Sequence, residues 1–256
     1  MHQVRHFSRT YRCVTYCHRG FPPSSVPDQL DAYTEGALVG DLLGLLDYLE
    51  LPRAFIVGHS MGGSVALNFA LRHAERCAGV VLAGTGSGTT NREQFKKDIA
   101  AVVDLIQTRG MREFASIYAE NPARVPFKRK DPLGWAEFRD QLGELSAVGS
   151  SLTMQGIQLR RPTIYDHKDE LPGLHVPTLI ILGDEDEPCI DPSVSLKRGI
   201  PSAGLVILPQ TGHTLPLEEP AAFNRAVQDF FHQVEHGRWT TRTTVSSSLL
   251  PAEART

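Results

Sequence analysis

A strand–turn–helix pattern around residues 54–70 constrains the fold of this chain more than any other part of its sequence. Residues 54–57 form an apolar run that is typical of a buried strand, and residues 64–70 have the composition of a helix. Between them stands Gly58-x-Ser60-x-Gly62, a spacing that predicts a sharp strand-to-helix corner. We expect glycines on both sides of the serine because side chains there would clash with the neighbouring strand and helix.

A serine at such a corner has a strained backbone and a hydroxyl group pushed into the open. Ser60 is therefore the candidate nucleophile. The backbone N–H of Met61, at the start of the following helix, would face the position where an oxyanion develops during acyl transfer. A glycine-rich turn without chemistry gives the same short pattern, so other catalytic groups have to be found.

Strand-like and helix-like runs alternate along the rest of the chain. The strand-like runs cover residues 11–17, 54–57, 80–83, 177–182 and 205–208, and the clearest helical runs cover 38–49 and 220–234. Short buried strands that alternate with helices predict an α/β fold, with a mostly parallel sheet covered by helices on both faces.

From about residue 91 to residue 171 the sequence pattern is helical, without strand-like runs. Helical stretches over 94–107, 111–120, 134–146 and 151–159 are joined there by turns. We interpret residues 91–171 as a helical lid inserted into a core formed by residues 1–90 and 172–238. Residues 239–256 are expected to be a frayed tail. The lid region offers apolar side chains that could line a pocket or simply pack the lid onto the sheet: Phe114, Ile117, Tyr118, Leu152 and Met154.

Composition narrows the class of protein. The 256 residues are 41% hydrophobic, enough for one large core, and the net charge of -3 gives no electrostatic case for nucleic-acid or membrane binding. The four cysteines lack metal-type spacing, so we expect reduced thiols and no cysteine metal site. With no signal peptide or long apolar run, we expect a cytoplasmic protein whose oligomeric state stays open.

A serine nucleophile needs a base, and the base needs an acid that orients it. His213 is the best candidate base because it follows the last predicted strand, at the edge of the sheet where active sites of α/β proteins gather. The acid is expected in the turn after strand 177–182. Asp186 is the first choice and Asp184 the alternative.

With these residues in place, the sequence resembles the α/β-hydrolase superfamily. The resemblance rests on Gly58-His59-Ser60-Met61-Gly62-Gly63, on the Gly183-x-x-Asp186 turn and on Gly212-His213, in the chain order serine, acid, histidine. It covers about residues 1–236 and implies that Ser60 is the nucleophile, Asp186 the acid and His213 the base. Its motifs specify the superfamily and not the substrate.

Two departures from the family pattern stand near the amino terminus. Cys17 occupies the position where the family usually has an aspartate. Met1 falls about where the family has the helix after its His-Gly loop, so the resemblance implies a shortened form without the first strands and without that loop's oxyanion donor. Strand 11–17 would then pair directly with strand 54–57, or both would keep open edges.

The resemblance implies a serine-dependent hydrolase without a cofactor that cleaves small hydrophobic carboxylic esters through an acyl-enzyme. Enol-lactone hydrolysis and C–C bond hydrolysis use similar machinery and stay open. So does a hydrolase-like binding protein or fragment that lacks a working oxyanion hole. A serine nucleophile argues against the branches of the family that use an aspartate.

Overall fold

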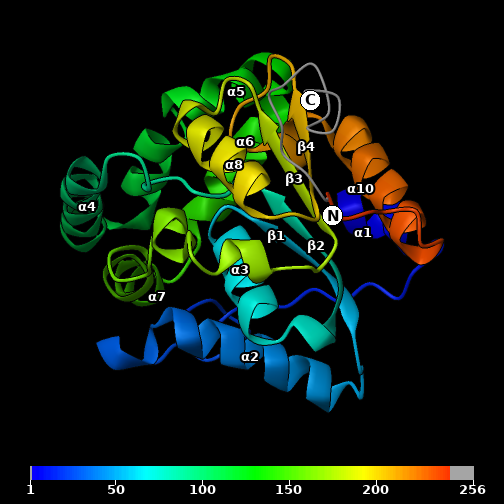
Figure 1. The fold of residues 1–256 in the computed structure, drawn as a ribbon. Coiled ribbons are helices and arrows are strands. Elements are labelled where there is room, and N and C mark those ends of the chain that lie inside the picture. Colours follow the sequence, from blue (N-terminus) through cyan, green and yellow to red (C-terminus); the bar gives the residue numbers. More distant parts are fainter. Residues whose placement is uncertain (1, 243–256) are drawn as a thin grey trace, which may run out of the picture.

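The computed structural model describes residues 2–242, and its centre is a four-stranded parallel sheet (Figure 1). The strands lie side by side in chain order: β1 (Ala54–His59), β2 (Cys77–Ala83), β3 (Thr178–Gly183) and β4 (Ala203–Leu208). Every residue of β3 is buried, as expected for a parallel strand covered on both faces. The four strands expected around 54–57, 80–83, 177–182 and 205–208 are thus confirmed.

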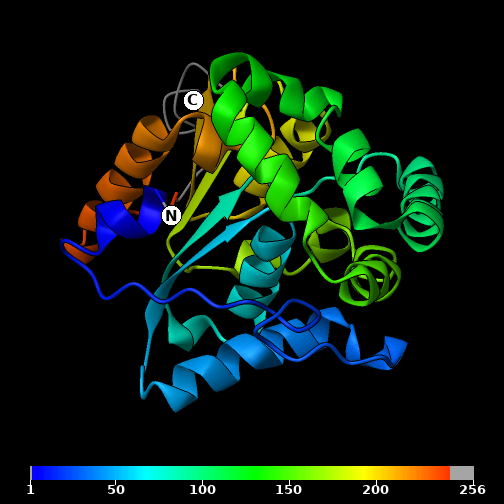
Figure 2. The same cartoon turned by 180° about the vertical axis from the view of Figure 1, so that it is seen from behind.

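Helices cover both faces of the sheet, and alternate residues of the strands contact them. Val80 and Leu82 pack toward α2 (Glu35–Tyr48) and α3 (Met61–Arg72), whereas Val81 and Ala83 pack toward the face covered by α10. Figures 1 and 2 show α1 beside α10 on that second face. The remaining elements of the core are α1 (His2–Phe7), α8 (Glu187–Gly199), α9 (Leu215–Glu218), α10 (Pro220–Glu235) and the 3-10 turns Leu30–Ala32 and Ala74–Arg76.

Between β2 and β3 the described chain contains helices and turns and no strand (Figure 2). These elements are α4 (Arg92–Tyr118), α5 (Val125–Lys130), α6 (Pro132–Gly143), α7 (Ala147–Thr153), a π turn (Met154–Gln158) and 3-10 turns at Pro122–Arg124, Ile164–His167 and Leu171–Gly173. The expected separation of helices 94–107 and 111–120 appears as a break within α4 at Gly110, whose φ of 82° lies in the left-handed region.

The expected strand over residues 11–17 is wrong. This segment connects α1 to the loop at Gly20, and no backbone hydrogen bond to another strand involves residues 12–17. β1 consequently has one strand neighbour, β2, in the described chain. Instead of pairing, the segment borders a groove of about 300 Å³ between itself, α2 and β1. Strand-forming residues are present here, but a strand forms only where a partner backbone lies within hydrogen-bonding reach.

The expected frayed tail is also wrong for Trp239 and Arg242, which contact the core. Trp239 packs edge-on against Phe230 with ring centroids 4.7 Å apart, and its indole N–H donates to the carbonyl of Ser202 at 2.7 Å. Arg242 donates to the carbonyl of Ile200 at 2.7 Å. The remainder of the predicted tail, residues 243–256, lies outside the described residues.

Across residues 2–242, no helix is long and apolar enough to cross a membrane.

Candidate active site

The corner between β1 and α3 places Ser60 in a strained conformation, with φ 54° and ψ −115°. The glycines around it differ in their roles. A Cβ atom on Gly58 would lie 2.1 Å from the carbonyl oxygen of Gly62, and one on Gly63 would lie 1.9 Å from Oγ1 of Thr85. A Cβ on Gly62 would meet nothing within 4 Å. The expected steric need for glycine therefore holds at Gly58 but falls on Gly63 instead of Gly62.

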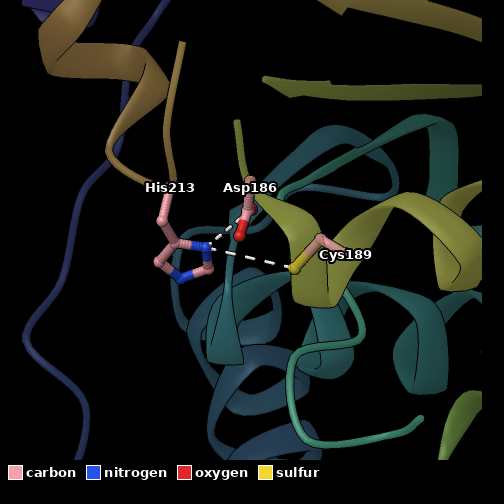
Figure 3. Close-up of side chains that lie close together, drawn as sticks. All are labelled: Asp186, Cys189 and His213. Carbon is pink, nitrogen blue, oxygen red and sulfur yellow. Dashed lines mark hydrogen bonds and ion pairs between the residues drawn. The ribbon is translucent and has the colours of Figure 1, made fainter. Parts of the chain in front are cut away.

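Ser60, His213 and Asp186 form a continuous chain of hydrogen bonds. The Oγ hydroxyl of Ser60 lies 2.9 Å from Nε2 of His213. Nδ1 of the same ring lies 2.8 Å from Oδ2 of Asp186, and Figure 3 shows this second contact. The three residues follow β1, β4 and β3, so the parallel sheet brings them together at the carboxyl ends of its strands. Asp186 is 1% exposed, which keeps its carboxylate away from competing water.

The alternative acid has a different place in the structure. Asp184 is exposed, and its Oδ1 accepts a hydrogen bond from the backbone N–H of Thr211 at 3.1 Å. It shapes the turn that precedes His213 but does not bond the imidazole ring. The geometry therefore favours Asp186 as the orienting acid.

The peptide that carries His213 is held on both sides. Its N–H donates to the carbonyl of Ala123 at 2.7 Å, and its C=O accepts from Nε2 of His59 at 2.6 Å. Burial is the main cause that lowers the pKa of His59 to about 4, and repulsion from His213 adds to it. His59 is thus neutral at physiological pH and donates its ring N–H. Nothing in the sequence except its neighbour Ser60 pointed to this contact.

A second residue that the sequence analysis missed is Glu218, which is 6% exposed. Its carboxylate accepts from the backbone N–H of Gly212 at 2.8 Å and from the backbone N–H of Thr214 at 3.0 Å. It also accepts from the Thr214 hydroxyl at 2.7 Å. The carboxylate thereby fixes the residues on either side of the candidate base. The spacing Thr214-x-x-x-Glu218, one helical turn, was the available signal.

The backbone N–H of Met61 stands at the first position of α3, where the helix itself offers no acceptor. This N–H is free to donate to an oxyanion formed on a carbon attached to Ser60 Oγ. The amino-terminal end of the helix dipole also favours negative charge there.

A cavity of about 560 Å³ opens beside Ser60 and His213. Of the side chains expected to line a pocket, Tyr118 and Met154 do so. Phe114 packs with Ile106 and Met111 inside the helical segment, and Leu152 packs against the main core, so neither lines this cavity. Ile117, also expected there, is 51% exposed and does not line it.

Cys189 lies beside the acid and the base (Figure 3). Its Sγ is 4.0 Å from Nδ1 of His213 and donates to the carbonyl of Gly84 at 3.4 Å. Burial raises the pKa of this thiol far above its usual value, so it is protonated. Asp186, Cys189 and His213 offer ligand atoms within 4.8 Å of one another, but a metal there would displace the hydrogen bond between acid and base.

With the geometry established, comparisons with known proteins place the chain in a family. A model of the alpha/beta hydrolase family matches residues 2–226. The putative 2-succinyl-6-hydroxy-2,4-cyclohexadiene-1-carboxylate synthase of Bacillus subtilis (strain 168) is 28% identical over 211 residues, which cover 79% of this chain and 74% of that protein.

Solved structures agree with this match. The enol-lactonase from Burkholderia xenovorans LB400 aligns with a TM-score of 0.78 and 28% identity, over 90% of this chain and 85% of that one. A thermophilic esterase from Thermogutta terrifontis aligns with a TM-score of 0.79 and 27% identity, over 91% and 84%. The matched region includes the serine corner, the acid turn and the histidine loop, and the chain belongs to the alpha/beta hydrolase family.

Proposed function

We propose that this protein is a serine hydrolase that cleaves carboxylic esters through an acyl-enzyme on Ser60. The observation that carries the proposal is the hydrogen-bonded chain from Ser60 Oγ through the imidazole of His213 to the carboxylate of Asp186. An isolated serine hydroxyl is a weak nucleophile at neutral pH, and a histidine oriented by an acid is the arrangement that activates it.

In the first step, Ser60 Oγ attacks the carbonyl carbon of the ester while its proton passes to Nε2 of His213. The negative charge that develops on the carbonyl oxygen is stabilised by the N–H of Met61. Asp186 accepts a hydrogen bond from Nδ1–H and stabilises the imidazolium. The C–O bond to the alcohol then breaks, and the imidazolium returns the proton to the leaving oxygen.

In the second step, a water molecule attacks the acyl carbon and gives its proton to Nε2 of His213. The bond to Ser60 Oγ breaks, the proton returns to the serine, and the carboxylic acid leaves. The clamps on the peptide of His213, from Ala123 and His59, hold the ring in place for both transfers. Correct orientation of this kind is worth several orders of magnitude in rate.

We further propose that residues 91–171 act as a lid over this chemistry. The segment contributes Tyr118 and Met154 to the cavity beside Ser60, and its Ala123 carbonyl bonds the backbone of His213. Movement of the segment would therefore open the cavity and loosen the base together. Such coupling would let the site exclude water once a substrate is bound.

An enol-lactone is the second candidate substrate, because a lactone is a cyclic ester and one of the similar solved structures is an enol-lactonase. In that case the leaving enolate stays tethered to the acyl group and leaves with it after hydrolysis. Ring opening without release of a separate alcohol distinguishes the two candidates.

The test is hydrolysis of p-nitrophenyl acetate and p-nitrophenyl butyrate, and the rate is measured as the release of p-nitrophenol. The proposal predicts turnover by the native protein and its loss in Ser60→Ala. Ser87→Ala is the matched control, since Ser87 lines the same cavity without reaching the histidine, and it should keep the native rate. A folded native protein that binds these esters without cleaving them would instead indicate a binding protein.

A further inference from the structure

Two buried arginines line the cavity that contains Ser60 and His213. Arg124 is 6% exposed and Arg161 is 9% exposed, and both contribute to the cavity of about 560 Å³. Arginine is rarely buried to this degree without an anionic partner. The sequence analysis gave neither residue a role.

Arg124 has unused hydrogen-bonding capacity. Its Nη2 donates to the hydroxyl of Tyr118 at 2.5 Å, and the guanidinium carbon lies 3.8 Å from the centroid of that ring. Its Nε is buried without a hydrogen-bond partner. Among residues 2–242, no carboxylate lies within ion-pair distance of this side chain. A guanidinium carries five N–H donors, and in the described residues only Nη2 of Arg124 has a side-chain partner, so Nη1 and the second N–H of Nη2 can still bond an anion in the cavity.

Burial of a charged guanidinium is unfavourable, because an ionised group loses its hydration when it is taken out of water without a counter-ion. Stacking on Tyr118 offsets part of this cost. A bidentate carboxylate is the ligand that satisfies the planar fork of an arginine most completely. The guanidinium of Arg124 therefore lacks an anionic partner that a ligand could supply.

Arg124 is also close to the chemistry. The carbonyl of the preceding residue, Ala123, accepts the backbone N–H of His213 at 2.7 Å. The charge of Arg124 contributes to the lowered pKa of His59, the neighbour of Ser60. An anion bound by Arg124 would thus lie in the same cavity as Ser60, so one small molecule could contact both residues.

Arg161 strengthens the positive character of the cavity. Its Nη2 donates to the backbone carbonyl of Ser87 at 3.2 Å, and it forms no ion pair in the described part of the chain. Burial lowers its pKa, and the charge of Glu35 partly opposes this. Four acids also line the cavity: Asp98, Glu187 and Asp191 are exposed, and the buried Asp186 is bonded to His213. The carboxylate of Asp186 is bonded to His213, so neither buried arginine has it as an ion-pair partner.

We propose that the natural substrate carries a free carboxylate in addition to the bond that is cleaved, and that Arg124 binds this carboxylate, with Arg161 adding to the positive potential. The inference rests on the proposed hydrolysis by Ser60 and deepens it. Esters of dicarboxylic acids and lactones that bear a free acid belong to this substrate class. The small hydrophobic ester expected from the sequence does not supply the missing anion.

The experiment compares mono-p-nitrophenyl glutarate with its neutral methyl ester, which has the same acyl chain without the charge. We expect native kcat/KM to be at least 10-fold higher for the acid, with most of the difference in KM. Arg124→Met should lower this acid-to-neutral ratio by about 10- to 100-fold, the range for a lost hydrogen-bonded charge contact. Arg160→Met, at an exposed neighbouring arginine, should keep the native ratio.

A binding measurement separates this proposal from the proposed reaction. Glutarate should raise the melting temperature of the native protein and of Arg160→Met, and Arg124→Met should lose this shift, whether or not any ester is hydrolysed. If Arg124→Met does not fold, the native preference for the acid and the native glutarate shift decide. A native preference for the neutral ester, no glutarate shift, or an unchanged ratio in a folded Arg124→Met would overturn the proposal.

Discussion

The two glycines that follow the candidate nucleophile should respond very differently to the addition of one methyl group. In Gly63→Ala the new Cβ would lie 1.9 Å from Oγ1 of Thr85, whereas in Gly62→Ala it would meet nothing within 4 Å. Thr85 is fully buried and its hydroxyl bonds the carbonyl of Ala83, so it has no solvent-facing position to rotate into. The corner or the threonine must therefore move.

The size of the effect follows from these distances. Opening the contact from 1.9 Å to an ordinary 3.4 Å requires a displacement of about 1.5 Å, shared between α3 and Thr85. Overpacking of this kind costs about 1–3 kcal/mol, or roughly 2–12 °C in melting temperature for a chain of this size. Because the N–H of Gly63 donates to the carbonyl of Ser60 at 3.0 Å, the nucleophile moves as well, and we expect about 100-fold lower activity.

In contrast, Gly62→Ala should keep the native stability or raise it by up to about 1 kcal/mol, since alanine favours a helix more than glycine does. Thermal unfolding and the rate of reaction with a fluorophosphonate measure the two effects. The double variant Gly63→Ala/Thr85→Ala removes the clashing hydroxyl and should recover much of both losses. Equal damage from the two single variants, or no recovery in the double variant, would refute the steric reasoning.

Three further predictions test other parts of the structure. Burial lowers the pKa of His59 from 6.5 to about 4, so only the unfolded state gains this proton as the pH falls from about 6.5 to 4. The free energy of unfolding should therefore fall by about 3 kcal/mol over this range. His59→Gln should remove that part of the pH dependence, measured by urea unfolding. Trp239→Ala should lower the melting temperature by about 4–8 °C, because about 2 kcal/mol of packing is lost, whereas Arg238→Ala at an exposed position should change it little. Asp186→Asn should lower kcat by about 10⁴-fold through the wrong tautomer of the base, and a larger loss in Asp184→Asn would reassign the acid.

The pattern of apolar residues along the chain predicted the four strands of the sheet. The apolar runs at 54–57, 80–83, 177–182 and 205–208 became β1 to β4, because short apolar runs of this kind favour the strands of a sheet covered by helices. The same reasoning failed at residues 11–17, where the composition suits a strand but no neighbouring backbone pairs with it.

In the candidate site, too, some residues could be found from local sequence and others only from contacts in the folded chain. Ser60, Asp186 and His213 stand in recognisable turns, and the structure brings all three within hydrogen-bonding distance. Arg124 carries no such pattern, because its importance comes from contacts made only after folding, and Glu218 has only its spacing of one helical turn from Thr214. The residues next to Trp239 in the sequence are mostly polar, which favours a loose tail. In the structure, however, Trp239 packs against Phe230 and bonds the carbonyl of Ser202.

The most direct test of the central claim is the mass of the intact protein after reaction with a fluorophosphonate, with Ser60→Ala beside it. The account predicts one adduct on the native protein, none on Ser60→Ala, and native labelling of Ser87→Ala. An adduct that persists in Ser60→Ala, or no adduct on a folded native protein, would contradict the claim that the relay of His213 and Asp186 activates Ser60.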